Sequence, residues 1–156
     1  MKHLVGTVLA IALSATAASA AHIEFSGSFC LTAANTTCTT NNWNVGQCFA
    51  TRFVAPNIGD TASTKLSIFS RTYATDFTLA SGSLIGTTFQ PVTVTKIASG
   101  GFQYNAAMRL TSQSPASPTS TTPFITQTGN VDGWDNIAGC TVQFKAAHTR
   151  CPQTFC

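Results

Sequence analysis

The chain contains very little charge. Of its 156 residues, eight are Lys or Arg and five are Asp or Glu, which makes 8% charged residues, against about 25% in an ordinary domain. So few dispersed cations do not form the basic patch that nucleic acid or an anionic membrane surface requires. We therefore expect no nucleic-acid partner and no electrostatic attachment to a membrane.

The chain also lacks a long apolar segment. The run at residues 4–13 is too short to span a bilayer, and no later segment approaches the ~20 apolar residues of a membrane helix. That run follows the basic start Lys2-His3, and small residues ending in Ala18-Ser19-Ala20 come after it. This three-part pattern is typical of a secretory signal peptide. We expect residues 1–20 to be cleaved, leaving residues 21–156 as one periplasmic or extracellular domain.

Residues for catalysis are scarce. The chain has three His and contains no Gly-x-Ser-x-Gly elbow, no Walker loop and no His-Glu-x-x-His motif. Its five carboxylates offer no distinguished pair of the kind that glycoside hydrolysis uses. We therefore expect no catalytic residues, no enzyme activity and no obligatory cofactor.

Uncharged polar residues take the place of charge. Residues 21–156 hold 24 Thr and 12 Ser, and the chain contains eleven Phe, two Trp and two Tyr. The aromatic residues can fill a core, Thr suits the solvent face of a strand and Ser suits turns. In composition the chain resembles bacterial pilus and adhesin subunits, which implies self-association or attachment as an expected function.

Alternation of apolar and polar residues recurs along the chain and predicts β-strands. It is clearest from Ile23 to Leu31, from Phe102 to Leu110 and from Val142 to His148. Residues 32–47 and 112–123 read as loops, and residues 99–101 as a hairpin turn. Short strands separated by Gly, Pro and Ser predict an all-β fold, a single small disulfide-stabilised β-sandwich (jelly-roll or Ig-like) or barrel.

Six cysteines agree with export, because disulfides persist in oxidising compartments. They form two groups, and the sequence alone leaves 15 pairings open. Pairing within each group of three leaves one cysteine over, so we expect one bridge to join the groups across a loop of about 90 or more residues. The cysteines are Cys30, Cys38, Cys48, Cys140, Cys151 and Cys156.

Two tryptophans lie in polar segments that resemble sugar-binding loops. Trp43 lies between Asn42 and Asn44, and Trp134 lies between Gly and Asp. An exposed indole can stack on a sugar while neighbouring amides bond its hydroxyls. The sequence therefore suggests an extracellular glycan as ligand; the alternative is that each indole covers a small core or a disulfide.

Oxygen-bearing side chains cluster near the second tryptophan. Asn130, Asp132, Asp135 and Asn136 offer four ligands of the kind that Ca²⁺ prefers, with Gly133 for a sharp bend. The spacing lacks the order of an EF-hand, and the same residues are common in turns. A Ca²⁺ site and a plain hairpin loop are both compatible with this segment.

A copper site depends on where the signal peptide is cut. Cleavage after Ala21 would make His22 the first residue, whose amine and ring nitrogen bind Cu(II), and His148 could supply the third nitrogen. This pair resembles the histidine brace of lytic polysaccharide monooxygenases. The resemblance implies a copper-dependent polysaccharide-active enzyme as an alternative function.

The main expectation is a secreted, non-catalytic β module. It would act as an extracellular or cell-surface binding, adhesive or structural subunit, with a second copy of itself, a glycan or a protein as partner. A secreted inhibitor or effector is the second interpretation.

Overall fold

The chain is described by a computed structural model that covers residues 22–55, 64–71, 73–79, 88–96, 99–102, 106–152 and 156. The expected signal peptide lies outside these residues. Within them, nine strands form one sheet in which every pairing is antiparallel. The expected all-β class is confirmed. The strands are β1 (Ile23–Ala34), β2 (Cys48–Ala55), β3 (Thr64–Phe69), β4 (Tyr73–Leu79), β5 (Thr88–Lys96), β6 (Ser99–Phe102), β7 (Ala107–Ser114), β8 (Phe124–Asp132) and β9 (Thr141–Arg150).

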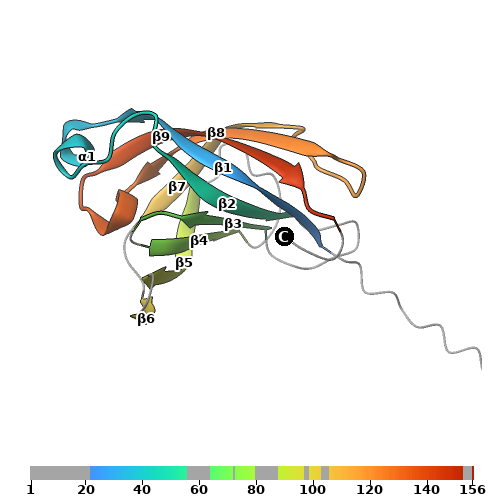
Figure 1. Ribbon diagram of the computed structural model, residues 1–156, viewed down its shortest axis with the longest axis horizontal. Coiled ribbons are helices and arrows are strands. Elements are labelled where there is room, and N and C mark those ends of the chain that lie inside the picture. The colour runs from blue at the N-terminus through green and yellow to red at the C-terminus, as the bar shows by residue number, and fades with distance from the viewer. Residues whose placement is uncertain are drawn as a thin grey trace, which may run out of the picture.

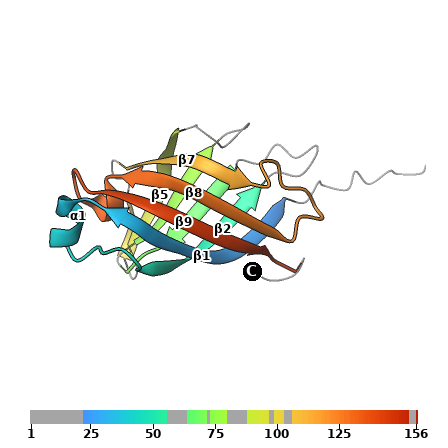
Figure 2. The same ribbon diagram turned by 90° about the horizontal axis from the view of Figure 1, so that it is seen from above.

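The sheet curls upon itself (Figures 1 and 2). Its strand order is β4-β3-β2-β1-β9-β8-β7-β5-β6, with a further pairing between β4 and β5. The first and last strands, β1 and β9, lie side by side near the middle of this order. The first and last described strands thus pair with each other, and β8 and β7 lie directly beyond β9. No helix in the described part is long and apolar enough to cross a membrane.

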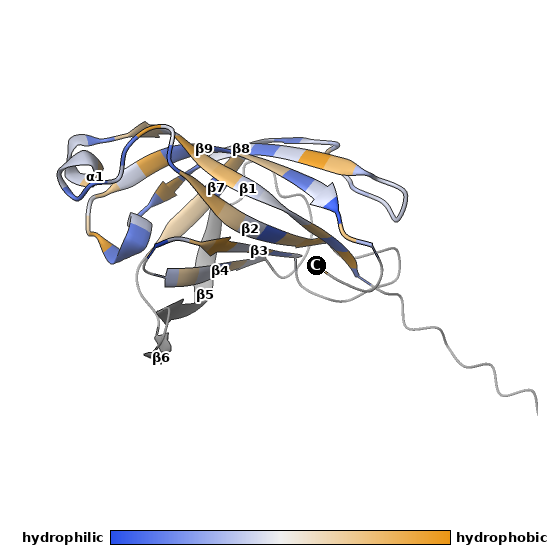
Figure 3. Ribbon diagram, in the orientation of Figure 1, coloured by the Kyte–Doolittle hydropathy of each residue, from blue (hydrophilic) through white to orange (hydrophobic). Residues whose placement is uncertain are grey.

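Alternation along the strands separates a buried inner face from a polar outer face. Along β9 every second residue from Val142 to His148 is buried, and hydrophobic and hydrophilic segments alternate along this strand in Figure 3. The side chains of β1 that face them include Phe25, Phe29 and Leu31. The alternation predicted for β1 and β9 is therefore confirmed, and the core lies inside the curl.

Two glycines allow neighbouring strands to approach closely. A Cβ atom at Gly27 in β1 would overlap the backbone oxygen of Ala147 in β9, and one at Gly129 in β8 would overlap the backbone oxygen of Arg109 in β7. Glycine inside a strand often marks such a close approach or a bend. A side chain at Gly27 would push β1 away from β9, and a side chain at Gly129 would push β8 away from β7.

Three disulfides join the described cysteines. Cys38–Cys140 links the two groups over a sequence separation of 102 and is fully buried, so the expected bridge between the groups is confirmed. Cys30–Cys48 and Cys151–Cys156 each contain one exposed cysteine. Their presence is consistent with an oxidising compartment.

Three local predictions were wrong. Strand β8 was not predicted, because Gln127 and Gly129 occupy inward positions where apolar residues were expected. The predicted loop 32–47 contains a short helix, α1 (Thr36–Thr40), whose first turn is capped by Asn35 accepting from the Cys38 N–H. The predicted turn at residues 99–101 belongs to β6 instead, which pairs with β5.

Candidate functional site

Two β-bulges mark one region of the outer face. The pairing of β1 with β9 shifts register between Leu31 and Ala33, and that of β7 with β8 shifts between Leu110 and Ser112. The extra residues are Thr32 and Thr111, and both are exposed. A bulge changes the direction of a side chain and is frequent beside functional sites. Because the strand order is β1-β9-β8-β7, the two bulges lie on either side of β9 and β8.

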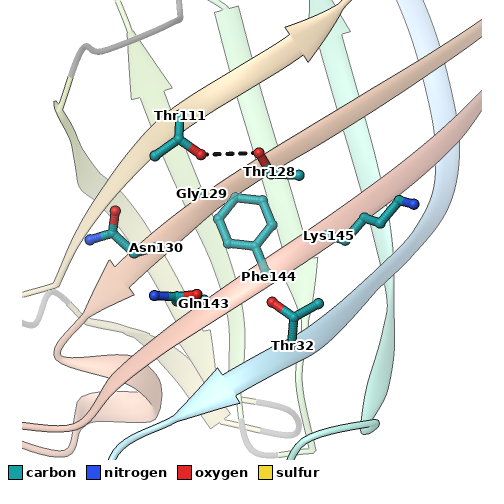
Figure 4. Close-up of a pocket in the computed structure, with 8 residues that line it drawn as sticks. All are labelled: Thr32, Thr111, Thr128, Gly129, Asn130, Gln143, Phe144 and Lys145. Carbon is teal, nitrogen blue, oxygen red and sulfur yellow. Dashed lines mark hydrogen bonds between the residues drawn. The ribbon is translucent and has the colours of Figure 1, made fainter.

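A groove lies between the two bulges (Figure 4). Its walls carry three hydroxyls, two amides and one ammonium group, and its floor is formed where Gly129 pairs with Phe144 across β8 and β9. The lining residues are Thr32, Thr111, Thr128, Gly129, Asn130, Gln143, Phe144 and Lys145. The walls can therefore donate and accept hydrogen bonds along the whole groove.

Hydrogen bonds between hydroxyls fix the wall of this groove that β7 and β8 form. The hydroxyl of Thr128 lies 3.0 Å from that of Thr111 and 2.6 Å from that of Ser112. The bulge in β7 exposes both partners on the same face, so one strand supplies two hydroxyls to one threonine. Among the eight lining residues, the Thr111–Thr128 contact is the hydrogen bond drawn in Figure 4, so the amides of Asn130 and Gln143 do not bond to each other.

The two tryptophans lie in the core instead of on the surface. Trp43 and Trp134 are each 3% exposed, and their rings meet edge to face with centroids 5.6 Å apart. Trp134 also stacks on Phe29 at 5.5 Å. Of the two interpretations of these tryptophans, the burial of the rings agrees with the second: both loops fold inward and cover the aromatic core. In this structure neither ring offers a free face to a sugar.

The asparagines beside Trp43 hold the loop in place. Asn42 has a φ of 64°, and its backbone oxygen accepts hydrogen bonds from Gln47 and Arg71. The Arg71 guanidinium carbon also lies 4.2 Å from the centre of the Trp43 ring, a cation–π contact. Asn44 donates its backbone N–H to the Gln47 side chain. These contacts order the loop, and sugar binding by Asn42 and Asn44 stays a prediction.

The proposed calcium ligands are not gathered around one point by their contacts. Asp132 accepts a hydrogen bond from Thr141 at the start of β9, whereas Asp135 accepts one from Ser70, which directly follows β3. Asn130 lines the groove, whereas Asn136 is exposed in a left-handed turn with a φ of 63°. In the described residues no three His, Cys, Asp or Glu side chains form a group that could hold a metal. Calcium binding stays a prediction.

The two histidines of the proposed copper site have separate partners. His22 is exposed, and its Nε2 lies 2.7 Å from Glu24. The hydrogen bond from Arg52 lowers the pKa of the Glu24 carboxyl below its usual value, so this acid stays ionised beside His22. His148 is buried inside the sheet on β9, with its ring centroid 5.9 Å from that of Phe53. Copper binding by this pair stays a prediction.

The contacts of His148 define its protonation state. Thr51 donates its hydroxyl hydrogen to the Ser67 backbone oxygen at 2.7 Å, so its oxygen accepts from His148 Nε2 at 3.4 Å. The other ring nitrogen, Nδ1, is buried without a partner in the described part. Burial lowers the pKa of His148 to about 4, because desolvation disfavours the charged form. The ring is therefore neutral at physiological pH.

The fold and the groove define a class: an antiparallel β-protein, linked by disulfides, with a polar groove on its outer face. Comparison of the chain with protein-family models, with curated proteins and with solved structures finds no match. The groove is therefore the feature of the molecule from which a function can be inferred.

The sequence analysis identified one of the groove residues, Asn130, and for a different role. Thr32, Thr111, Thr128, Gln143 and Lys145 were missed, because polar residues at alternating positions look like any solvent-facing strand. The two bulges that turn them into one site depend on pairing between distant strands. Alternation in β9 placed Gln143 and Lys145 on the outer face, and that was the one available signal.

Proposed function

We propose that the protein is a secreted, non-catalytic module that binds a hydroxyl-rich extracellular glycan in the groove. The observation that carries this proposal is the pair of bulges, which direct Thr32 and Thr111 toward the groove from opposite sides. Bulges cost regular ladder hydrogen bonds, so two of them around one groove favour a functional role.

The chemistry of the walls supports a glycan as ligand. Hydroxyls both donate and accept hydrogen bonds, and a side-chain amide offers two donors and an acceptor. Asn130 and Gln143 lie directly opposite each other on β8 and β9, so their amides can bond adjacent hydroxyls of one sugar. Lys145 is the one charged residue of the lining, and the groove therefore suits a neutral or weakly acidic saccharide.

The scaffold supports a preformed site. We infer that the sheet closes into a barrel instead of a sandwich, because β4 pairs with β3 and with β5, and β5 pairs in turn with β7. These pairings form an unbroken ring through β1, β9 and β8. A closed sheet has no free edges and holds outer side chains in fixed register.

Glycan binding can be tested by titrating soluble polysaccharides into the oxidised protein and following the heat of binding. The double variant N130A/Q143A removes both amides from the groove, and we expect it to weaken binding by about 5- to 150-fold, since each lost hydrogen bond to a ligand contributes about 0.5–1.5 kcal/mol. A matched control, S26A/T149A, removes two hydroxyls that pair on β1 and β9 outside the groove.

Two results would contradict the proposal. One is the absence of binding across neutral and acidic polysaccharides. The other is equal loss of affinity in N130A/Q143A and in S26A/T149A, which would mean that the groove has no special role. Far-UV and near-UV circular dichroism of each variant verifies that the fold is retained.

A further inference from the structure

The three disulfides differ in how well thiols can reach them. Cys38 and Cys140 are both 0% exposed, whereas Cys48 is exposed and Cys30 is half-buried on the outer face. Thiol–disulfide exchange begins with attack of a thiolate on one sulfur, so its rate depends on access. Exposed disulfides are accordingly the labile ones.

A cation lies beside the Cys30–Cys48 bridge, which distinguishes it from a bridge that is merely exposed. Cys48 pairs with Cys30 across β2 and β1, Cys30 pairs with Lys145 across β1 and β9, and Lys145 pairs with Thr128 on β8. These outward positions form one row across four strands. Directly paired residues in antiparallel strands have Cβ atoms about 4.5–5.5 Å apart. The Lys145 ammonium is therefore within reach of the sulfur of Cys30, and it has no carboxylate partner among the ion pairs of the described residues.

We propose that Cys30–Cys48 is a thiol-exchange site at which a low-molecular-weight monothiol becomes joined to Cys48. This inference is independent of glycan binding. The thiolate attacks Sγ of Cys48, the more exposed of the two cysteines, and a new S–S bond forms there. The bond between Cys30 and Cys48 breaks, and Cys30 Sγ leaves with the electron pair as a thiolate. The reaction consumes one thiolate and releases one, so it needs no further oxidant or reductant.

Lys145 gives this reaction its direction. Its positive charge stabilises the thiolate that develops on Cys30 when Cys48 is attacked. Attack on Cys30 would instead release the thiolate on Cys48, one strand further from the ammonium. The geometry therefore favours the adduct on Cys48 over the adduct on Cys30. Lys145 thus acts only through its charge, which stabilises the leaving thiolate of Cys30, and it forms no covalent bond.

The test uses the full-length oxidised protein, 2-mercaptoethanol as the neutral monothiol, and iodoacetamide to trap the sulfur that is released. Trapping is needed because the released Cys30 lies beside the adduct and would restore the original bridge. Peptide mass spectrometry then gives the amounts of adduct on Cys48 and on Cys30. We expect the Cys48 adduct to form before Cys38 or Cys140 reacts.

The role of Lys145 is tested by the ratio of the two adducts. In K145Q we expect the Cys48-to-Cys30 ratio to fall by about 1.5- to 5-fold, the range of an exposed charge pair, while K145R retains it. The matched control K65Q removes a lysine on β3, which pairs with β2 at Val54, away from the bridge. Exchange at Cys151–Cys156, measured in the same digest, stays unchanged in K145Q.

Other outcomes overturn the inference. Exchange at Cys38 or Cys140 before Cys48 would show that exposure does not select the bridge. An unchanged ratio in K145Q would show that Lys145 does not direct the attack. A general slowing without a change of ratio would mean that the lysine only attracts the thiolate, and the proposed direction would then be wrong.

Discussion

Two parts of the interior are built on opposite principles. The aromatic cluster, which comprises Phe29, Trp43, Phe49, Trp134 and Phe144, is held by ring contacts with centroids 4.2–5.8 Å apart. The polar cluster, which comprises Thr51, Gln113, Gln127 and His148, is equally buried but consists of two hydrogen-bonded pairs, Gln127 with Gln113 and His148 with Thr51. In the polar cluster, Gln127 Oε1 and His148 Nδ1 have no partner among the described residues. The aromatic cluster contains one such atom as well, Trp134 Nε1, but it has no titratable group, whereas the polar cluster contains His148 and so carries a desolvation cost that pH can change.

The aromatic cluster is reinforced by the buried disulfide. The backbone N–H of Trp43 donates to the backbone oxygen of Cys38, and the backbone N–H of Trp134 donates to the backbone oxygen of Cys140. The bridge thus holds together the two loops that carry the indoles. Removing it by C38A/C140A should lower the free energy of unfolding by about 4–5 kcal/mol, because the closed loop spans 102 residues. Chemical denaturation followed by tryptophan fluorescence measures this loss.

The terminal bridge is the matched control for that experiment. Cys151–Cys156 has a sequence separation of 5, and in the chain-entropy model C151A/C156A costs about 2 kcal/mol. If both double variants lost the same free energy of unfolding, loop length would not determine how much each bridge stabilises the fold. The expectation that Cys38–Cys140 stabilises the fold more than Cys151–Cys156 would then be wrong.

Truncating an indole tests the packing half of the comparison. W134A removes a ring that contacts Phe29, Trp43 and Phe49, and we expect a loss of about 3–4 kcal/mol from apolar transfer and cavity formation. Because the Trp134 Nε1 atom has no partner in the described residues, no side-chain hydrogen bond is lost with the ring. W134F retains most of the contact and should lose less than half as much. Equal losses in the two variants would mean that ring volume does not decide stability here.

Acid titration tests the polar half. Burial lowers the pKa of His148 to about 4, while an unfolded histidine titrates near about 6.5. The unfolded state therefore binds more protons between these values, and stability falls as the pH falls through this window. The full loss, reached below about pH 4, is roughly 3 kcal/mol.

The non-titrating variant H148Q isolates this contribution. Urea unfolding from about pH 7 to about pH 4 should show a smaller decline in H148Q than in the native protein. Acids such as Glu24, whose pKa is lowered by its hydrogen bond from Arg52, lose stabilisation on further acidification in both proteins. If the two profiles were parallel between about pH 6.5 and pH 4, the protonation of His148 would not be linked to unfolding.

The parts of the fold that could be predicted from the sequence are the strands in which apolar and polar residues alternate regularly. Strands β1 and β9 alternate clearly, and the expectation that His148 lies on the apolar side of β9 is confirmed by its burial. The same reasoning failed for β8, where Gln127 and Gly129 face inward. These residues fit only because Gln113 bonds the amide and β7 approaches the glycine. Such partners come from another strand and are not visible in a local pattern.

The candidate site was missed for a related reason. Thr32 and Thr111 lie on the groove because bulges redirect them, and a bulge is a property of two paired strands. The asparagine-rich surroundings of Trp43 suggested exposure, but the loop folds over because Arg71 and Gln47 hold its backbone. The two cysteine groups were more informative, since an odd number in each required a bridge between them whatever the fold.

The smallest expected effect concerns the pair of buried glutamines. Gln127 donates to Gln113 Oε1 at 2.7 Å, and Gln113 donates to the Ala116 backbone oxygen at 2.9 Å, which ties the chain after β7 to the interior. Q127M should destabilise the protein by about 1–2 kcal/mol, because it leaves the Gln113 oxygen buried and unpaired. The double variant Q113M/Q127M removes both partners and should lose less than the sum of the single variants. Strict additivity, measured by urea unfolding of all four proteins, would mean that the glutamines act separately and that their hydrogen bond does not couple them.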